Sequence, residues 1–280
     1  MPKSKKKSKK KPESSRLTEG AAVESVNLMR PGMPAPDSII SVRPLRTAEA
    51  MAAAETLAVP TYRIIQTNEV DGYEKAATSQ ETLNAALATP EAAPSDNFAG
   101  TARKAAKLSI ADAPTKTLTD LKTLINSLPS HEDMKNHSPK IKTTATSNRV
   151  TEEKRNVRIK VFLYAASRED DNDFHLILGR DPANSPELYM TMELSGLPPA
   201  SSASFDKLKA AHDAFKVFFG NDLPGTTYDF YDPPIPVKIE GSLFWDATHA
   251  TGTRPGPKSL KSRMPVVWEV HPITKIVFNP

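Results

Sequence analysis

Seven acidic and imidazole side chains in the second half of the chain have the types and spacing for metal binding or acid–base chemistry. They are Asp173, His175, Glu193, Asp246, His249, Glu269 and His271. Carboxylates and imidazoles are common ligands of zinc, manganese and non-haem iron, and His–Glu pairs also perform general acid–base catalysis. Of these residues, His175, Glu193, His249 and His271 are the candidate ligands for a divalent metal. The alternative is a network of hydrogen bonds between carboxylates and imidazoles, since no spacing equals a motif such as H-E-x-x-H.

Strand alternation places most of these side chains on one face of a sheet. In the stretches around His175, Glu193 and His271, the residues next to the polar ones are large and apolar. Because residues i and i+2 share a strand face, each stretch has one apolar side and one side with carboxylate or imidazole groups. If these strands are neighbours, Asp173, His175, Glu193, Glu269 and His271 converge. Asp246 and His249 stand where a further strand enters a loop.

The elements that must position these residues follow the order β-β-β-α-β-β. Strands are predicted over residues 157–165, 173–179, 188–194, 237–245 and 266–278, the last interrupted at Pro272, and an amphipathic helix over 204–219. A proline-rich connection is expected over 228–236 and a long loop over 247–263. This order matches the OB-fold, a small five-stranded barrel with a helix between its third and fourth strands. We therefore expect a mainly β chain with an OB-like barrel over residues 151–280.

Residues 1–150 are expected to form a largely disordered arm. They hold only three of the eighteen aromatic residues, Tyr62, Tyr73 and Phe98, and are rich in Ala, Pro, Thr, Ser and Lys. Such a composition offers little apolar area to offset the entropy lost on ordering. Marginal or partner-induced helices are predicted over 48–58, 79–88, 101–108 and 118–128. The folded part is expected to begin near Thr151.

Two groups of cations indicate a polyanionic partner. The first is a lysine run near the start of the chain that includes Lys5, Lys6, Lys7, Lys9, Lys10 and Lys11. The second lies in the predicted loop between the last two strands and comprises Arg254, Lys258, Lys261 and Arg263, with no acid among them. In OB barrels this loop helps to bind single-stranded nucleic acid, with Phe244, Trp245 and Tyr164 as candidate stacking partners. A solvated tail, an anionic membrane surface or nuclear import are alternative interpretations of the lysine run.

The composition excludes several classes of protein. Without cysteine there is no disulfide framework, thiolate nucleophile, zinc ribbon or iron–sulfur cluster. No run of apolar residues is long enough to predict a membrane-spanning helix. No apolar segment follows the lysine run, so no signal peptide is predicted, and we expect a cytoplasmic protein, or a nuclear one in a eukaryote.

Four segments resemble an uncharacterised, mostly bacterial family of OB-like β-barrel proteins. They are DFHLILG (173–179), YMTMELSGLP (189–198), GSLFWDATHATG (241–252) and WEVHPIT (268–274). The relatives share a D-[FY]-H-L strand, a central Glu, a [FW]-[FW]-D-x-x-H segment and a final E-[ILV]-H-P strand. The resemblance covers the predicted barrel, leaves the arm unmatched and marks the seven acidic and imidazole residues as a signature. It implies no activity.

Three functions are consistent with these observations. The leading hypothesis is a non-catalytic OB-like module that binds single-stranded nucleic acid or another polyanion with help from the lysine run. The rival is a metal-assisted hydrolase of a phosphodiester or similar bond, with Glu193 or Glu269 as base or ligand and His175, His249 and His271 holding a divalent ion. The third is a structural adaptor that binds a protein partner through the arm.

Overall fold

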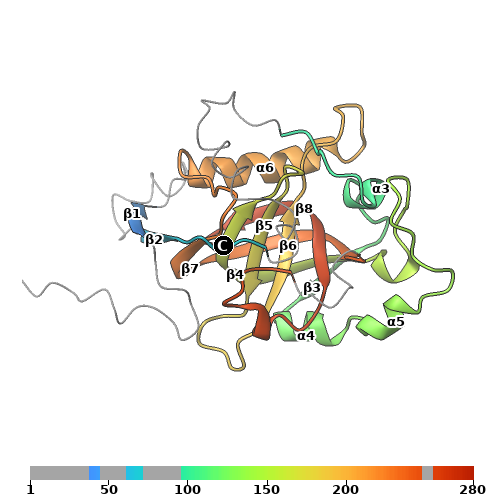
Figure 1. The fold of residues 1–280 in the computed structure, drawn as a ribbon, viewed down its shortest axis with the longest axis horizontal. Coiled ribbons are helices and arrows are strands. Elements are labelled where there is room, and N and C mark those ends of the chain that lie inside the picture. Colours follow the sequence, from blue (N-terminus) through green and yellow to red (C-terminus); the bar gives the residue numbers. More distant parts are fainter. Residues whose placement is uncertain (1–37, 45–60, 72–95, 248–254) are drawn as a thin grey trace, which may run out of the picture.

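The structure is a computed structural model that describes residues 38–44, 61–71, 96–247 and 255–280, with the backbone alone described for 38–44. The described chain is mainly β, as predicted, and its strands form one eight-stranded sheet (Figure 1). The strands are β1 (Ser38–Pro44), β2 (Thr61–Gln66), β3 (Thr115–Leu118), β4 (Asn156–Arg168), β5 (Phe174–Gly179), β6 (Tyr189–Leu194), β7 (Asp229–Trp245) and β8 (Trp268–Phe278). The helices are α3 (Lys104–Lys107), α4 (Leu121–Asn126), α5 (His131–Lys135) and α6 (Phe205–Phe219), with short 3-10 helices η3 (Thr151–Glu153) and η5 (Lys261–Arg263).

Five of the strands pair in a ring. Going round it, β4 pairs with β5, β5 with β6, β6 with β8, β8 with β7, and β7 again with β4. All of these pairs are antiparallel except β6 and β8, which run parallel where Met192 meets Val270. Outside the ring, β2 and β1 continue the sheet from β7, and β3 lies parallel to β4.

The fourth ring strand begins earlier than predicted. Residues 229–236, expected as a connection, belong to β7. The early part of β7 has two partners, because Phe230 lies opposite Ile65 of β2 and Ala165 of β4. Pro233 and Pro234 fall where the β4–β7 register jumps, from Leu163 opposite Ile235 to Ala165 opposite Phe230. A proline lacks the N–H that a regular ladder requires, so such an irregularity accommodates it.

The last strand is not interrupted at Pro272 as predicted, but its pairing with β7 is irregular there. β8 runs without a break from Trp268 to Phe278. Its register with β7 shifts twice next to Gly241, which lies opposite Ile273. β8 therefore continues through Pro272 but has the extra residue at each shift, because Gly241 and Leu243 are two positions apart while their partners Ile273 and Val270 are three apart.

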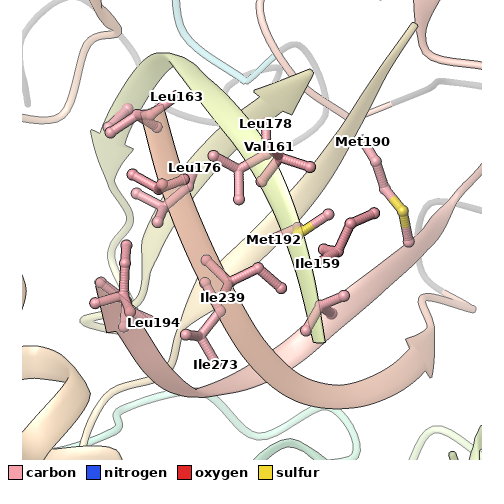
Figure 2. Close-up of a cluster of buried hydrophobic side chains, with 14 of the residues drawn as sticks. Ile159, Val161, Leu163, Leu176, Leu178, Met190, Met192, Leu194, Ile239 and Ile273 are labelled. Carbon is pink, nitrogen blue, oxygen red and sulfur yellow. The ribbon is translucent and has the colours of Figure 1, made fainter. Parts of the chain in front are cut away.

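Aliphatic side chains fill the space that the ring encloses. Figure 2 shows side chains of this cluster from all five strands pointing toward one another, and those labelled are Ile159, Val161, Leu163, Leu176, Leu178, Met190, Met192, Leu194, Ile239 and Ile273. Each is at most 2% exposed to solvent. The predicted apolar faces of the second and third strands thus form the core.

The opposite faces of β5 and β6 are buried as well. Every residue of both strands is buried. A second hydrophobic cluster lies against their outer side, in which Ile177 and Tyr189 pack with Tyr228, Leu260 and Met264. The faces of β5 and β6 that point away from the core are therefore covered by other segments of the same chain.

Helix α6 follows β6 and lies across one side of the ring, as predicted (Figure 1). Its buried stripe includes Leu208, Phe215 and Phe219, and the last two lie against Phe278 of β8 with ring centroids 6.2 and 6.0 Å away. Glycine at the C-cap, Gly220, takes a positive φ of 58°, which an L-residue adopts with difficulty. Neither α6 nor another helix in the described ranges has the length and apolar character needed to cross a membrane.

The prediction that the chain before residue 151 is a disordered arm is wrong for residues 61–71 and 96–150. Leu118, Leu121, Leu124, Met134 and Ile141 are buried in the same core as the ring. Burial of these aliphatic side chains supplies apolar area that offsets the entropy lost when the segment becomes ordered. The helices expected over 101–108 and 118–128 are present in shorter form as α3 and α4. The lysine run and the helices expected over 48–58 and 79–88 lie outside the described residues.

Two buried arginines join the segment 96–153 to the ring. Arg103 makes a double ion pair with Glu153, with both nitrogen–oxygen distances 2.6 Å, and also donates to Trp245 O at 3.1 Å. Arg149 donates from one nitrogen to Ala106 O at 2.7 Å and to His271 O at 2.6 Å. Because these guanidinium groups satisfy backbone carbonyls of separate segments, they fix the segments against one another.

Asp120 also joins the segment 96–153 to the ring strands, through a contact with Arg180 that depends on pH. Its carboxylate caps α4 by accepting from Lys122 N at 2.7 Å, and it accepts two hydrogen bonds from Arg180, at 2.8 and 2.7 Å. Arg180 is the main reason that the pKa of Asp120 lies below its ordinary value of 3.8. A depressed carboxyl pKa stabilises the fold above that value, and the contribution disappears as the pH falls through the folded-state pKa.

Replacing Asp120 with asparagine is therefore expected to destabilise the protein at neutral pH and to have less effect in acid. The measurement is urea unfolding of the wild type and Asp120→Asn at a series of pH values. The difference in unfolding free energy should be fully present at pH 6 and should shrink as the pH falls below 3.8. A difference independent of pH would contradict this role. Asp112→Asn, on another exposed acid, is the control.

Candidate metal centre

Strand register brings four of the predicted residues together. His175 of β5 lies directly opposite Glu193 of β6, and Asp173 immediately precedes β5. On the other side of β6, Met192 lies opposite Val270 of β8, so the following residues, Glu193 and His271, become neighbours. Three adjacent strands thus each contribute polar side chains to one place outside the core.

The distances within this group are those of ion pairs. His271 Nδ1 lies 2.5 Å from Glu193 Oε2, and His271 Nε2 lies 3.5 Å from Asp173 Oδ2. His175 Nε2 lies 3.2 Å from Glu193 Oε1. Glu269 approaches from β8, with Oε2 3.8 Å from His271 Nδ1. Glu193 therefore stands between two imidazoles.

Asp173, Glu193 and His271 form the part of the group best suited to hold a metal ion. One ligand atom from each of the three lies within 4.8 Å of the others, and all three residues are at most 1% exposed. His271 Nδ1 and Glu193 Oε2 are in close contact with each other, whereas His271 Nε2 and Asp173 Oδ2 make no hydrogen bond of good geometry with a described residue. The other oxygen of Asp173 accepts from Gly196 N at 2.6 Å, which leaves Oδ2 directed at the other two side chains.

Burial and neighbouring charges shift the pKa of each of these three residues. Burial lowers the pKa of His271, but the carboxylates of Glu193 and Asp173 outweigh it and raise the pKa to about 9. Burial works against the ionised form of Glu193, yet the imidazoles of His175 and His271 hold its pKa well below the ordinary value. Burial, helped by Asp171, raises the pKa of Asp173 well above its ordinary value. At neutral pH a proton thus occupies the imidazole of His271, one of the groups that a metal would ligate.

Two further acids lie beside His175. Its Nδ1 lies 3.7 Å from Glu169 Oε1 and 3.9 Å from Asp71 Oδ2. Glu169 in turn accepts from Ser167 Oγ at 2.7 Å, and Asp71 accepts from Gly256 N at 2.6 Å. Burial lowers the pKa of His175, but the Glu193 and Glu169 carboxylates raise it well above its ordinary value. These partners orient His175, and His175 orients Glu193.

Lys107 and Asp171 form the rim where the group comes closest to solvent. The side chain of Lys107 is 12% exposed and that of Asp171 is 20% exposed. Lys107 Nζ lies 3.8 Å from Asp171 Oδ2 and 4.0 Å from Asp173 Oδ2. Asp246, which was predicted for this face, is buried and also acts on the charge of Lys107.

Sequence analysis missed Lys107, Asp71, Glu169 and Asp171. Lys107 and Asp71 lie in the part assigned to the disordered arm, and nothing in their surroundings marks them. Glu169 and Asp171 carried a signal, because they belong to a turn, SREDDN, that places three acids directly before the Asp173 strand. The predicted ligand His249 lies outside the described residues.

The described residues give the nucleic-acid hypothesis little support. Phe244, Trp245 and Tyr164 are at most 3% exposed, so the proposed stacking rings are buried. Arg263 is paired with Glu187 and lies over the Tyr189 ring, 5.4 Å from its centroid. Lys258 and Lys261 stand in the loop that covers β5 and β6. The remaining cations, which are Arg254, Lys5, Lys6, Lys7, Lys9, Lys10 and Lys11, lie outside the described residues, and their role stays a prediction.

Three cavities in the described part of the chain lie away from Asp173, Glu193 and His271. The largest of them, about 520 Å³, lies between the α3 region and the start of α6 and is lined by Leu108, Pro198 and Ser204 among others. The other two, about 330 and 400 Å³, lie beside Arg180 and between α6 and β8. None of the three is lined by Asp173, Glu193 or His271.

Comparison of the chain with protein-family models, with curated proteins and with solved structures gives no match. The resemblance to an OB-like family therefore stays a prediction.

Proposed function

We propose that this protein is an OB-like module that binds one divalent cation between Asp173, Glu193 and His271. The observation that carries the proposal is the convergence of these three buried side chains from neighbouring strands, with ligand atoms within 4.8 Å of one another. A buried charged group is stable only when it is paired or coordinates a metal. A cation among these atoms would satisfy the ones that lack hydrogen bonds.

The OB-like assignment is supported by strand order. The ring runs β4–β5–β6–β8–β7, so the fifth strand of the ring in sequence lies between the third and the fourth. The one long helix, α6, connects the third ring strand to the fourth. The parallel pairing of β6 and β8 is the contact that closes the ring. We expect a small closed barrel from these connections.

The balance of charge also favours a bound cation. Acids outnumber bases in and around these three residues. The acids are Asp71, Glu169, Asp171, Asp173, Glu193, Asp246 and Glu269, and the bases are Lys107, Arg149, His175 and His271. A divalent ion compensates part of this excess. Two carboxylates with one imidazole suit manganese or zinc better than calcium or magnesium, which prefer oxygen ligands alone.

Binding is favoured over the metal-assisted hydrolysis considered from the sequence. A catalytic metal keeps an open coordination position for water or substrate. Here the three ligands are at most 1% exposed, Lys107 lies over them, and the described cavities are lined by other residues. The proposed ion therefore stabilises the fold and compensates charge.

The test compares two buried histidines. Purified full-length chain should carry, or take up, one manganese or zinc ion, as measured by elemental analysis and isothermal titration calorimetry. Replacing His271 with glutamine should weaken binding at least about tenfold, because one of three ligands is lost. His212→Gln is the matched control, because His212 is also buried but lies on α6 against Phe174. Absence of binding by the wild type, or equal binding by both variants, would refute the proposed function.

A further inference from the structure

Lys107 places a fixed positive charge beside the proposed metal ligands. Its ammonium lies 4.0 Å from Asp173 Oδ2, the oxygen that faces His271 Nε2. Glu193 and Asp246 also act on it electrostatically. An ion bonded to Asp173 Oδ2 at about 2.1 Å would lie within about 6 Å of the ammonium nitrogen.

The position of Lys107 is imposed by the surrounding structure. Arg149 donates from the same nitrogen to Ala106 O and to His271 O, so the residue before Lys107 is tied to the backbone of a proposed ligand. The ammonium also lies 5.9 Å from the centroid of the Phe98 ring and 6.0 Å from that of Phe244. Aromatic faces attract cations, so these rings favour the inward position of the lysine.

We propose that Lys107 is a built-in competitor of the divalent cation, which compensates the carboxylates when no metal is bound and weakens metal binding by charge repulsion. This inference rests on the proposed cation site. Like charges a few ångströms apart repel strongly where water is largely excluded. The site would then be tuned to release its ion, whereas the same ligands without Lys107 would hold it tightly.

The experiment measures manganese and zinc affinity after the charge at position 107 is removed. Isothermal titration calorimetry is performed on the full chain of the wild type, Lys107→Met, Lys107→Gln and Lys107→Arg. The two neutral variants should bind the ion at least about tenfold more tightly than the wild type. Lys107→Arg keeps the charge and should stay near the wild type. Lys104→Met is the matched control, because Lys104 lies on the same helix and donates to Phe98 O at 3.4 Å.

Thermal unfolding, without and with added metal, supplies a second measurement. Without added metal, Lys107→Met should melt below the wild type, because carboxylates have lost a neighbouring cation. Manganese should raise its melting temperature by more than it raises that of the wild type. If the variant folds only with manganese present and not with sodium at equal ionic strength, that result also supports the competitor role.

The outcomes separate this inference from the proposed function. Neutral variants that bind metal no more tightly than the wild type, while His271→Gln binds more weakly, would overturn the role of Lys107 and leave the cation site standing. Neutral variants that bind more weakly would show that Lys107 supports the ligands, which also overturns it. If neither the wild type nor any variant binds manganese or zinc, both proposals fail.

Discussion

Replacing Glu153 with glutamine is expected to lower the free energy of unfolding by about 3–5 kcal/mol. Glu153 is fully buried and accepts from both terminal nitrogens of Arg103, at 2.6 Å each. It also accepts from Val150 N at 2.8 Å and from Trp245 N at 2.9 Å. Glutamine has nearly the same shape but directs an N–H₂ group at one pair of these donors. Arg103 would then be a buried charge without its counter-ion.

The neighbouring acid supplies the control for this prediction. Glu152 has a side chain that is 35% exposed and pairs with His137 at the surface. Glu152→Gln should change stability by less than about 1 kcal/mol, the usual range for exposed ion pairs. Urea unfolding followed by circular dichroism gives both values. Equal effects for the two variants would show that the buried pair does not hold the segment 96–153 on the ring.

Gly241→Ala is expected to destabilise the protein by about 3 kcal/mol. A Cβ atom at this position would lie 2.5 Å from Pro272 O and 2.5 Å from Val270 Cγ1. The first contact is with backbone, so rotation of a side chain cannot relieve it. Gly241 lies in β7 where the register with β8 shifts, and the opposite strand carries His271. The alanine must therefore push the two strands apart next to the proposed ligands.

The same substitution at Gly225 provides the comparison. A Cβ on Gly225 has no described atom within 4 Å, so alanine should be tolerated with little change in stability. Thermal or urea unfolding of the two variants measures the difference. If Gly241→Ala is as stable as Gly225→Ala, the close approach of β7 and β8 at the bulge is not required by the fold.

Both predictions concern the surroundings of the candidate metal centre. Arg103 and Arg149 hold α3, and thereby Lys107, against β7 and β8, and β8 carries the proposed ligand His271. The bulge at Gly241 sets the path of β8 just beyond His271. Loss of either contact should therefore reduce cation binding as well as stability, which calorimetry on the folded fraction of each variant can measure.

Local sequence pattern was sufficient for the five ring strands, apart from the start of β7, and for the long helix and the polar face, but not for β1, β2 and β3. Alternation of apolar and polar residues is a property of neighbouring positions, so it placed His175 and Glu193 on one side of their strands without knowledge of the partner strands. The spacing of Leu208, Phe215 and Phe219 likewise reports one helix face. These features are determined by residues that lie close to one another in the sequence.

Tertiary contacts alone decided the start of β7, the folding of residues 96–150 and the burial of the polar face. Phe230 is in a strand because Ile65 and Ala165 lie beside it. Lys107 lies near Asp173, 66 positions further along the chain, and Arg149 holds the segment of Lys107 against β8 at His271. Charge attraction and burial depend on distance in space, so neither composition nor periodicity of the segment around Lys107 could predict that it would cover the carboxylates and imidazoles of three distant strands.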